Sequence, residues 1–411
     1  MKTLHYTLTR LGVMGLVMGC AGSADQTSRR SPPVRPGIEV LLSDRVDLVA
    51  GRRIGLVTNH AGVDSRGVHD VERLRAAGLT ITALFSPEHG FRGAAAPGEA
   101  VEHSVDSATG LPIYSLYGRT SSPTPRMLEE VDVMVVDLPD AGARYFTYIT
   151  TTAAVMRAAG ELGIPVVVLD RPNPIGGYRQ GNITQAEHRS VVGLLSVPMR
   201  HGLTLGEQAL LARGELGIDV DLAVVTVDGW NRSMAFDDTD LPFVRPSPNL
   251  PTLESLFHYP GLCLFEGTAL SVGRGSEAPF EQIGAPWLDT LSVLAIIRRS
   301  RLPGVEFHGV TFTPSAPGDA KFPDRNLTGI RLRVSDRKVY DPTVTAVYLL
   351  SAVLSRHPDQ IGWFDRHFDR LAGGPRLRQS LISGTDPAAI VQPWQAELDA
   401  FQARVAPYLL Y

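Results

Sequence analysis

The sequence has little cysteine and lacks the short motifs that identify several common classes of enzyme. Its two cysteines, Cys20 and Cys263, cannot supply a paired-cysteine zinc motif, and no HExxH motif occurs. There is no P-loop, and the first strand-like run leads into Ala61-Gly62-Val63 rather than a GxGxxG loop. These absences predict a protein without a cofactor and favour a hydrolase over a dehydrogenase.

A metal site has weak support in the sequence. His60, His89 and His201 lie on separate predicted loops rather than within one ligand motif. We therefore predict no metal. Because Asp, Glu and His side chains from different loops can converge in space, a metal-dependent hydrolase remains an alternative.

A large excess of charge of one sign is also lacking. The formal net charge is -4, and no basic patch or RNA-binding signature occurs, which argues against a nucleic-acid partner. Hydrophobic residues make up 44% of the 411 residues. This composition and length are sufficient for two domains with cores of ordinary size.

The N-terminus contains a hydrophobic run that is too short to cross a bilayer as a helix. Basic residues precede the apolar run Leu11–Met18, which ends at Gly19-Cys20 and is typical of a secretory signal. Small and apolar residues before Cys20 resemble a lipobox, the bacterial motif whose cysteine becomes lipidated. Residues 1–20 are therefore predicted to be a signal peptide with a lipobox, and residues 21–37 a flexible tether. An ordinary signal peptide or an uncleaved anchor is the alternative.

Lipidation of Cys20 would have two consequences. It would leave Cys263 without a partner, so we expect no intrachain disulfide. It would also make the protein an exported, membrane-anchored lipoprotein. Ala21 is not an inner-membrane retention signal of the Asp type, so in a cell with two membranes we expect the periplasmic face of the outer membrane.

Residues 38–240 are predicted to form a Rossmann-like α/β domain with a mostly parallel sheet, because short apolar runs alternate with helical patterns. Thr204 followed by Glu207 is a capping-box signature, which gives Glu207 a structural interpretation. The expected strands are Arg53–Thr58, Ile81–Phe85, Pro112–Leu116, Val133–Asp137, Pro165–Leu169 and Leu222–Val227, and the expected helices are Val68–Ala77, Thr150–Leu162 and Thr204–Gly214.

A Pro-rich passage from Asp237 to Pro260 follows, and its prolines predict an ordered crossover that contains neither regular helix nor central strand. Residues 241–411 comprise this crossover and a smaller α+β C-terminal domain that closes a cleft. The expected helices are Trp287–Arg301, Thr343–Arg356 and Ile390–Val405, and the expected strands lie near Val305–Thr313 and Gly329–Val334.

Polar clusters follow four of the apolar runs, at the point where each predicted strand ends. They are Asn59-His60, Glu88-His89, Asp137 with Asp140, and Arg171 with Asn173. In open α/β sheets, ligands bind outside the carboxyl ends of the strands. The sequence therefore predicts an active site at this edge of the sheet.

Glu88 is the strongest single candidate for catalysis. It lies between Pro87 and His89-Gly90, which fix a tight turn after a buried strand. Partial burial there would favour the protonated carboxyl that a general acid needs. The structural alternative is a loop carboxylate that caps a helix or pairs with Arg92.

Two further clusters combine carboxyl and guanidinium groups. Asp137 and Asp140 precede Arg144, and Glu266 precedes Arg274 in a glycine-rich segment. The first cluster could supply a second acid beside an anion-binding arginine, or an ion pair that only holds a loop. The glycines of the second resemble a phosphate-cradling loop, but no Gly-Lys-Ser/Thr follows, so a P-loop is excluded. The turn that contains Arg171 and Asn173 could likewise bind ligand hydroxyl groups or be a structural Asx-type turn.

Eight motifs occur in order between about residue 38 and residue 411. They are LVTNHAGVD, FSPEHGFRG, DLPDAGARYFTYITT, LDRPNPIGG, VPMRHGLTLGE, RPSPNLPT, FEGTALSVGRG with PFEQIGAPW, and an Arg-x-x-x-Tyr-Leu-Leu-Tyr ending. This set resembles the NamZ-type exo-β-N-acetylmuramidases, a bacterial family. One departure is Pro139, where the family more often has Gln before the second Asp, and this puts the substrate preference in doubt.

The resemblance implies a glycoside hydrolase that removes terminal N-acetylmuramic acid from the non-reducing end of peptidoglycan fragments. In the usual scheme two carboxyl groups flank the scissile bond. Glu88 is the expected acid/base, assisted by His89, and its partner would be Asp137, Asp140 or Glu266. The 2-acetamido group of the sugar is the alternative nucleophile.

The lactyl carboxylate of N-acetylmuramic acid calls for an arginine, and Arg144 and Arg274 are the candidates, with Arg200 a third. Other substrate contacts are expected from Asn59, His60, Tyr145, Arg171 and Asn173. Two other functions stay open at this point: a non-catalytic surface lipoprotein that binds muropeptides, and a metal-dependent esterase or amidase of the cell wall.

Overall fold

The computed structural model describes residues 33–95 and 98–411. The predicted signal peptide, Cys20 and nearly all of the predicted tether lie outside these residues. Pro33–Tyr411 forms one compact unit. Within the described residues, no helix has the length and apolar character needed to cross a membrane.

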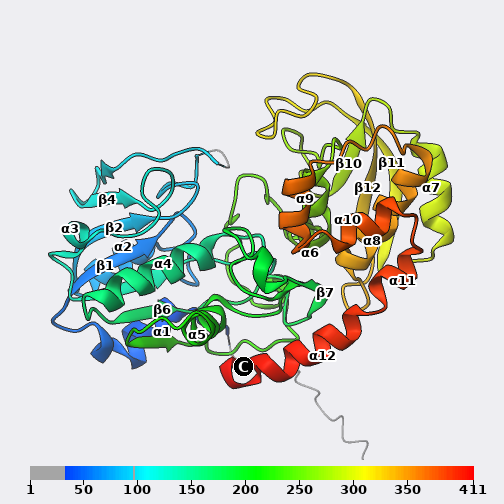
Figure 1. The fold of residues 1–411 in the computed structure, drawn as a ribbon. Coiled ribbons are helices and arrows are strands. Elements are labelled where there is room, and N and C mark those ends of the chain that lie inside the picture. Colours follow the sequence, from blue (N-terminus) through cyan, green and yellow to red (C-terminus); the bar gives the residue numbers. More distant parts are fainter. Residues whose placement is uncertain (1–32, 96–97) are drawn as a thin grey trace, which may run out of the picture. The chain divides into compact units, whose positions relative to one another are not determined.

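A seven-stranded sheet forms the centre of the N-terminal lobe, with the order β3-β4-β2-β1-β5-β6-β9 (Figure 1). Every neighbouring pair is parallel except β3 and β4, so the predicted α/β fold is confirmed. The strands are β1 (Arg53–Thr58), β2 (Thr80–Ser86), β3 (Ser104–Val105), β4 (Pro112–Ser115), β5 (Val133–Asp137), β6 (Val166–Leu169) and β9 (Leu222–Val225).

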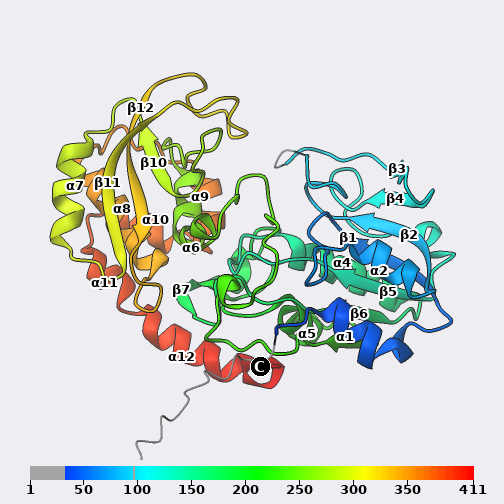
Figure 2. The same ribbon diagram turned by 180° about the vertical axis from the view of Figure 1, so that it is seen from behind.

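Helices cover both faces of this sheet because alternate strand residues point to opposite sides. Leu56 and Val135 pack into the core beneath α1 (Gly37–Asp44) and α2 (Asp70–Ala76), which lie in front of the sheet in Figure 2. Val57 and Val136 point to the other core, which α4 and α5 cover. The helices on that side and at the sheet edge are α3 (Pro125–Leu128), α4 (Tyr148–Glu161) and α5 (Leu205–Glu215).

The C-terminal lobe contains a three-stranded antiparallel sheet in the order β10-β12-β11, with helices packed around it. The strands are β10 (Gln282–Ala285), β11 (Val305–Phe312) and β12 (Leu327–Val334). The helices are α6 (Leu253–Leu262), α7 (Thr290–Arg299), α8 (Pro342–Arg356), α9 (Asp365–Ala372), α10 (Arg376–Ile382), α11 (Pro387–Val391) and α12 (Trp394–Val405). This lobe confirms the predicted smaller α+β domain.

Local signals placed most helix ends correctly. The capping box of Thr204 and Glu207 begins α5, and Asp341 caps α8 with Pro342 in its first turn. The prediction that the Pro-rich passage contains no regular helix was wrong. Thr252 caps α6, and Pro260 lies in its last turn, where a proline interrupts few helical hydrogen bonds.

Other features were not predicted from the sequence, among them β10, α9 and α10. The predicted last helix is two helices, because α11 ends at Val391 and α12 begins at Trp394, directly after Pro393. The segment before α5 forms an antiparallel pair, β7 (Gln180–Ile183) with β8 (Pro198–Arg200). One hydrophobic core runs from the sheet into the C-terminal helices, and the predicted domain boundary at residues 240/241 stays a prediction.

Candidate active site

The loop after β2 brings Glu88 out of the sheet. β2 ends at Ser86, and the Gly90 N–H donates to the Pro87 carbonyl at 3.0 Å to close a tight turn. His89 has a φ of +70° and Gly90 a φ of +72°. A left-handed histidine is strained, and such strain is commonly found at functional sites. The predicted role of Gly90 in the turn fits this geometry.

The Glu88 carboxylate is half-buried and held at both oxygens. Thr147 Oγ1 donates to Oε2 at 2.8 Å, and the Gly98 N–H donates to Oε1 at 3.1 Å. The phenol of Tyr117 also interacts with Glu88. Burial, with the carboxylate adding to it, raises the pKa of Tyr117 to about 12, so Tyr117 stays a donor at neutral pH. These contacts orient the carboxylate and leave it at the surface of the lobe.

The His89 ring lies beside this carboxylate and is buried. Its Nδ1 is 3.0 Å from the Ala95 carbonyl oxygen. Because a carbonyl only accepts, the hydrogen of a neutral ring is assigned to Nδ1, and Nε2 carries the free lone pair. Burial lowers the pKa of His89, an effect that Glu88 opposes and Arg274 reinforces. The neutral ring can therefore accept a proton or a hydrogen bond at Nε2.

In the C-terminal lobe, Glu266 and Arg274 form an ion pair with Nε–Oε1 at 2.6 Å. Burial opposes ionisation of Glu266, but Arg274 and nearby cations offset it and leave the pKa of Glu266 lowered. Arg274 Nη1 is buried without a hydrogen-bond partner among the described residues. An unpaired buried donor costs free energy, so Arg274 keeps one hydrogen-bond donor that the described residues do not use.

Electrostatic interactions connect the two groups. The Arg274 charge contributes to the lowered pKa of His89, and the Glu88 charge contributes to the raised pKa of Tyr259, a neighbour of Arg274. The candidate site therefore combines residues of both lobes that lie within electrostatic range of one another. Its partly accessible polar side chains are His60, Glu88, Tyr117, Thr147, Glu266, Arg274 and His367.

Asp137, a predicted catalytic partner, is fully buried in an ion pair. Its two oxygens accept from Arg171 Nε at 2.5 Å and Nη2 at 2.9 Å, and Nη2 also donates to the Val63 carbonyl. Burial lowers the pKa of Arg171, but the Asp137 carboxylate more than offsets it and the pKa is raised. Both members of this pair have a structural role, and neither meets Glu88.

Asp140 and Asn173 are also held by neighbours within the lobe. Asp140 Oδ2 accepts from Gln208 Nε2 at 2.8 Å and lies 3.2 Å from His201 Nε2. Asn173 donates to the Leu203 carbonyl at 2.8 Å and accepts from the Ile175 N–H. The structure thus gives Asn173 the Asx-type turn that was the alternative to ligand binding.

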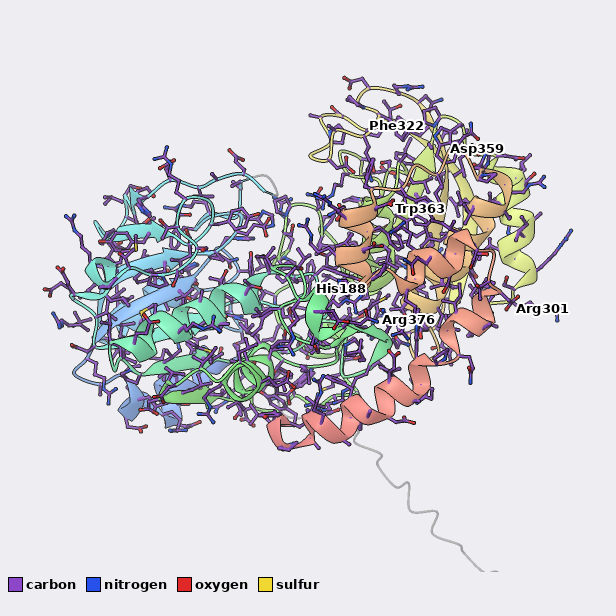
Figure 3. The ribbon with its side chains drawn as sticks, in the orientation of Figure 1. His188, Arg301, Phe322, Asp359, Trp363 and Arg376 are labelled. Carbon is purple, nitrogen blue, oxygen red and sulfur yellow. The ribbon has the colours of Figure 1, made fainter. Side chains whose placement is uncertain are left out.

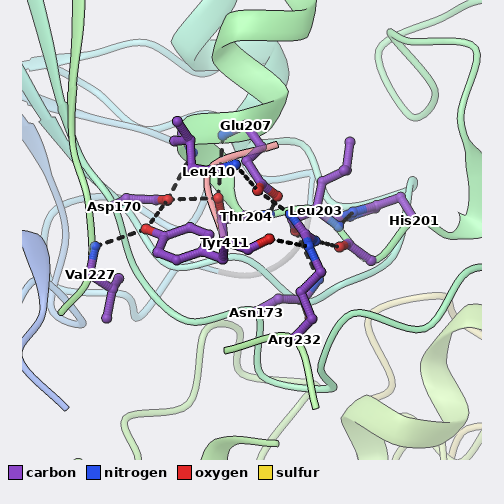
Figure 4. Close-up of polar contacts among 12 residues, drawn as sticks. Asp170, Asn173, His201, Leu203, Thr204, Glu207, Val227, Arg232, Leu410 and Tyr411 are labelled. Atoms are coloured by element: carbon purple, nitrogen blue, oxygen red, sulfur yellow. Dashed lines mark hydrogen bonds and ion pairs between the residues drawn. The ribbon is translucent and has the colours of Figure 1, made fainter. Parts of the chain in front are cut away.

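The end of β6 carries a third buried carboxyl, Asp170 (Figure 4). It accepts from Thr204 Oγ1 at 2.6 Å, from the Gly206 N–H at 2.8 Å and from the Tyr411 hydroxyl at 2.7 Å. Burial raises the pKa of Asp170 to about 6. This network attaches the C-terminal residues to the sheet and leaves the carboxyl inaccessible to a ligand.

Arg144 and Tyr145 join the two lobes. Arg144 is 3% exposed, and its Nη2 donates to the Leu371 carbonyl at 2.7 Å while Nη1 donates to the Asn182 carbonyl at 2.8 Å. The Tyr145 hydroxyl donates to the Pro260 carbonyl at 3.1 Å. Both terminal nitrogens of Arg144 are occupied, which favours a structural role over binding of a substrate carboxylate.

Of the remaining candidates, Asn59 is buried and His60 is partly accessible. Asn59 donates to the Tyr148 hydroxyl at 2.9 Å and accepts from the Ala61 N–H at 3.0 Å. His60 Nε2 lies 2.9 Å from the Arg245 carbonyl. Arg200, the third arginine considered for the lactyl group, is fully buried. His60 is thus held against the crossover through Nε2 and stays partly exposed, whereas Asn59 is buried and bonded within the lobe.

Sequence reasoning missed Tyr117, Thr147 and His367. Tyr117 follows β4 by two residues, so the strand-end argument applied to the other clusters could have found it. Thr147 directly precedes α4 and lies within the motif DLPDAGARYFTYITT, but it was not singled out there, and His367 lies in α9, outside the quoted motifs. Among the described residues, no group of three or more His, Cys, Asp and Glu side chains is placed to hold a metal ion.

Comparisons with known proteins agree with this two-lobe arrangement. Residues 54–254 match the family described as exo-β-N-acetylmuramidase NamZ, N-terminal, and residues 257–411 match its C-terminal counterpart. The chain is 41% identical over 415 residues to the peptidoglycan β-N-acetylmuramidase NamZ of Bacillus subtilis, with 100% of both chains covered.

Two solved structures of DUF1343 family proteins from Bacteroides fragilis share the fold. One is 34% identical with a TM-score of 0.85, and the other is 30% identical with a TM-score of 0.76. Each comparison covers 92% of this chain and 99% of the other. The similarity therefore includes both lobes.

Proposed function

The chain belongs to the NamZ family of exo-β-N-acetylmuramidases, and from this premise we propose that it hydrolyses the glycosidic bond of terminal N-acetylmuramic acid at the non-reducing end of peptidoglycan fragments. It is a glycosidase, and its substrate is peptidoglycan. The relatives favour neither a binding lipoprotein nor a metal-dependent esterase. The observation that carries the assignment of the site is the oriented Glu88 carboxylate, which shares its surroundings with the Glu266–Arg274 pair.

Glu88 is proposed as the acid/base residue. Its oxygens are fixed by Thr147 and the Gly98 N–H, so the proton it transfers has a defined direction. His89, with a free lone pair at Nε2, is placed to accept a proton or to hold the attacking water. A water molecule between Glu88 or His89 and the anomeric carbon would complete hydrolysis.

A single protein carboxylate at the bond is the scheme that we favour. Asp137 and Asp140 are bound to Arg171 and to Gln208, and Glu266 is bound to Arg274. Without a free second carboxylate among these candidates, the 2-acetamido oxygen of the sugar is the better nucleophile. This oxygen attacks the anomeric carbon while Glu88 protonates the leaving oxygen, and water then opens the cyclic intermediate.

The scheme is tested with a substrate in which the 2-acetamido group is replaced by 2-trifluoroacetamido. Fluorine withdraws electrons from the acetamido oxygen, so participation of that oxygen predicts a fall in kcat of several hundredfold or more, on the order of a lost catalytic group. An enzyme carboxylate acting as nucleophile predicts little change, and that result would redirect attention to Glu266.

Arg274 is proposed to bind the lactyl carboxylate. Its Nε is fixed by Glu266, and its Nη1 has no hydrogen-bond partner among the described residues. Arg274→Ala should raise KM for a chromogenic muramic acid glycoside and leave that of the glucosamine analogue, which lacks the lactyl group, nearly unchanged. Arg144→Ala is the matched control. It should lower the stability of the protein and affect KM for the two substrates alike. Equal losses on both substrates in Arg274→Ala would remove Arg274 from recognition.

The activity itself is tested by product analysis. Muropeptide fragments with muramic acid at the non-reducing end should release free N-acetylmuramic acid, one terminal residue at a time. Fragments capped there with N-acetylglucosamine should be inert. Cleavage within the chain, or release of peptide rather than sugar, would overturn the proposal.

Membrane attachment is a separate proposal that rests on sequence. Small and apolar residues precede Cys20 in the chain, and a lipidated cysteine would anchor the exported enzyme near its polymeric substrate. In a two-membrane cell, the site of attachment would be the periplasmic face of the outer membrane. Cys20→Ser should move the protein out of the membrane fraction, and mass spectrometry of the mature N-terminus should find lipid on Cys20. An unmodified Cys20 would rule out the anchor and leave the enzyme assignment intact.

A further inference from the structure

Lys321 is a buried cation in the long connection between β11 and β12. The chain has three lysines, Lys2, Lys321 and Lys338, and the side chain of Lys321 is 9% exposed. Burial lowers its pKa, although Asp319 and Glu266 oppose this. Removing an ammonium group from water is costly, so the contacts that compensate it indicate what the residue does.

Those contacts converge on the turn that carries Glu266. Lys321 Nζ donates to the carbonyl oxygens of Phe265 at 3.3 Å, Glu266 at 3.1 Å and Leu270 at 2.9 Å. An ammonium group has three donors that point in different directions, which suits three carbonyls around one point, whereas the planar guanidinium of arginine does not. Lys321 therefore fixes the backbone of Cys263–Gly267 (η4) and of the residues after it.

The same connection also contacts the backbone beside Arg274. The Ser315 N–H donates to the Gly275 carbonyl at 2.8 Å, and Gly275 has a φ of +76° with the Ser315 carbonyl 2.5 Å from the position that a Cβ would take. Four non-glycine residues of the connection have left-handed backbones. They are Ala316, Ala320, Phe322 and Asp324, of which Phe322 is labelled in Figure 3.

A left-handed backbone is strained for a non-glycine residue, and it persists when its surroundings over-determine it. The connection is thus held in a strained form while it contacts both segments of the Glu266–Arg274 pair. Figure 1 shows it extending beyond the three-stranded sheet of the C-terminal lobe. A segment that only linked β11 to β12 would have no need of this strain.

We propose that Lys321 is a positioning residue for substrate selection: by binding the three carbonyls it fixes Glu266, and Glu266 in turn orients Arg274 toward the lactyl carboxylate. This inference rests on the proposed function of Arg274. Lys321 does not touch the sugar. Its effect reaches the ligand through the ion pair of 2.6 Å between Glu266 and Arg274.

The test measures binding of two sugars by calorimetry, using the full chain with Glu88→Gln to prevent turnover. In this background the affinity for N-acetylmuramic acid should exceed that for N-acetylglucosamine. Lys321→Met should weaken binding of N-acetylmuramic acid roughly tenfold or more, the range of a hydrogen bond to a charged group, and leave N-acetylglucosamine unchanged. Lys321→Arg should not restore the preference, because a planar fork cannot reach all three carbonyls.

Lys338→Met is the matched control, since that lysine is exposed, and it should bind both sugars normally. If Lys321→Met does not fold, Lys321→Gln keeps a donor at the same position and is measured in the same way. An unchanged ratio of the two affinities in folded Lys321 variants would overturn the inference, even with a lowered Tm. If the parent protein shows no preference for N-acetylmuramic acid, the assignment of Arg274 fails first, and the Lys321 role fails with it.

Discussion

The end of β2 and the ends of β5 and β6 lie at the same edge of one sheet, yet their polar side chains have different partners. At β5 and β6, Asp137, Asp140 and Asp170 are each bound by side chains of the same lobe or by the C-terminal residues. At β2, Glu88 accepts two hydrogen bonds and stays half-buried. A strand-end position therefore predicts a polar cluster, whereas the number of internal partners decides whether a ligand can use it.

The crossover explains the difference physically. Residues around Phe236 and Pro242 lie over the ends of β5 and β6 and leave a cavity of about 40 Å³, which Asp140 and Arg171 also line. A buried carboxylate without a partner would be very costly, so each one beneath this cover is paired. Glu88 at the end of β2 stays partly exposed, and its neighbour His89 lies close enough to Arg274 for the two to interact electrostatically. Catalysis is thus expected at one end of the strand edge and stability at the other.

The largest expected effect is at β2. Glu88→Gln keeps the shape of the side chain but cannot exchange a proton, so kcat should fall roughly 10²–10⁴-fold with little change in Tm. Turnover is measured on a chromogenic muramic acid glycoside. Asp140→Asn, the same chemical change at β5, should retain near-normal kcat per folded molecule. Similar losses of kcat in Glu88→Gln and Asp140→Asn would show that the ends of β2 and β5 do not differ in function.

The next effect is at β5. Asp137→Asn leaves the buried Arg171 guanidinium without its carboxylate, which should lower the free energy of unfolding by roughly 3–5 kcal/mol. Denaturant titration measures this loss. The exposed pair of Asp237 with Arg337 is the control, and Asp237→Asn should cost less than about 1 kcal/mol. If Asp137→Asn has little effect on the free energy of unfolding but abolishes turnover, Asp137 takes part in catalysis.

Much of the fold was predictable because its signals are local. Every expected strand of the main sheet was found within two residues of its predicted ends, as hydrophobic runs of this kind must be buried. The helix N-caps at Thr204 and Asp341 could equally be predicted from the sequence. Only α6 was excluded wrongly, because Pro260 was taken as a helix breaker although it lies in the last turn.

The site was less predictable because contacts between residues far apart in the sequence decide which polar side chains are free to bind a ligand. The sequence does not show that Arg144 meets Leu371, or that Asp170 meets Tyr411, since each pair is separated by more than 200 residues. Arg144 and Arg274 have the same chemistry in the sequence. In the fold, the terminal nitrogens of Arg144 are occupied by carbonyls, whereas Arg274 Nη1 has no partner among the described residues.

A third prediction concerns pH and the end of β6. Burial raises the pKa of Asp170 from its ordinary value of 3.8 to about 6, so the folded state binds the proton more tightly than the unfolded chain does. The stability from this group is complete below about pH 4 and is lost as the pH rises through 6, by roughly 3 kcal/mol when ionisation is complete. Unfolding free energies of the parent and of Asp170→Asn are compared between pH 4 and 8. The free energy of unfolding of Asp170→Asn should lack the decrease with rising pH that comes from this carboxyl. Parallel profiles would mean that Asp170 does not titrate there.

The smallest effect belongs to the hydroxyl group of Tyr411, and it sharpens the same prediction. This hydroxyl donates to Asp170 at 2.7 Å and accepts from the Val227 N–H at 2.8 Å. Tyr411→Phe leaves that N–H without its partner and should lower the free energy of unfolding by roughly 1–2 kcal/mol.

The hydrogen bond from Tyr411 also favours the ionised form of Asp170, so its removal should raise the pKa of Asp170 further. The pH at which stability is lost should then move upward, while kcat stays near normal because Tyr411 contacts the β6 end and not Glu88. If Tyr411→Phe instead lowered kcat with no change in the stability profile, the β6 end would have a part in catalysis that its hydrogen bonds do not indicate.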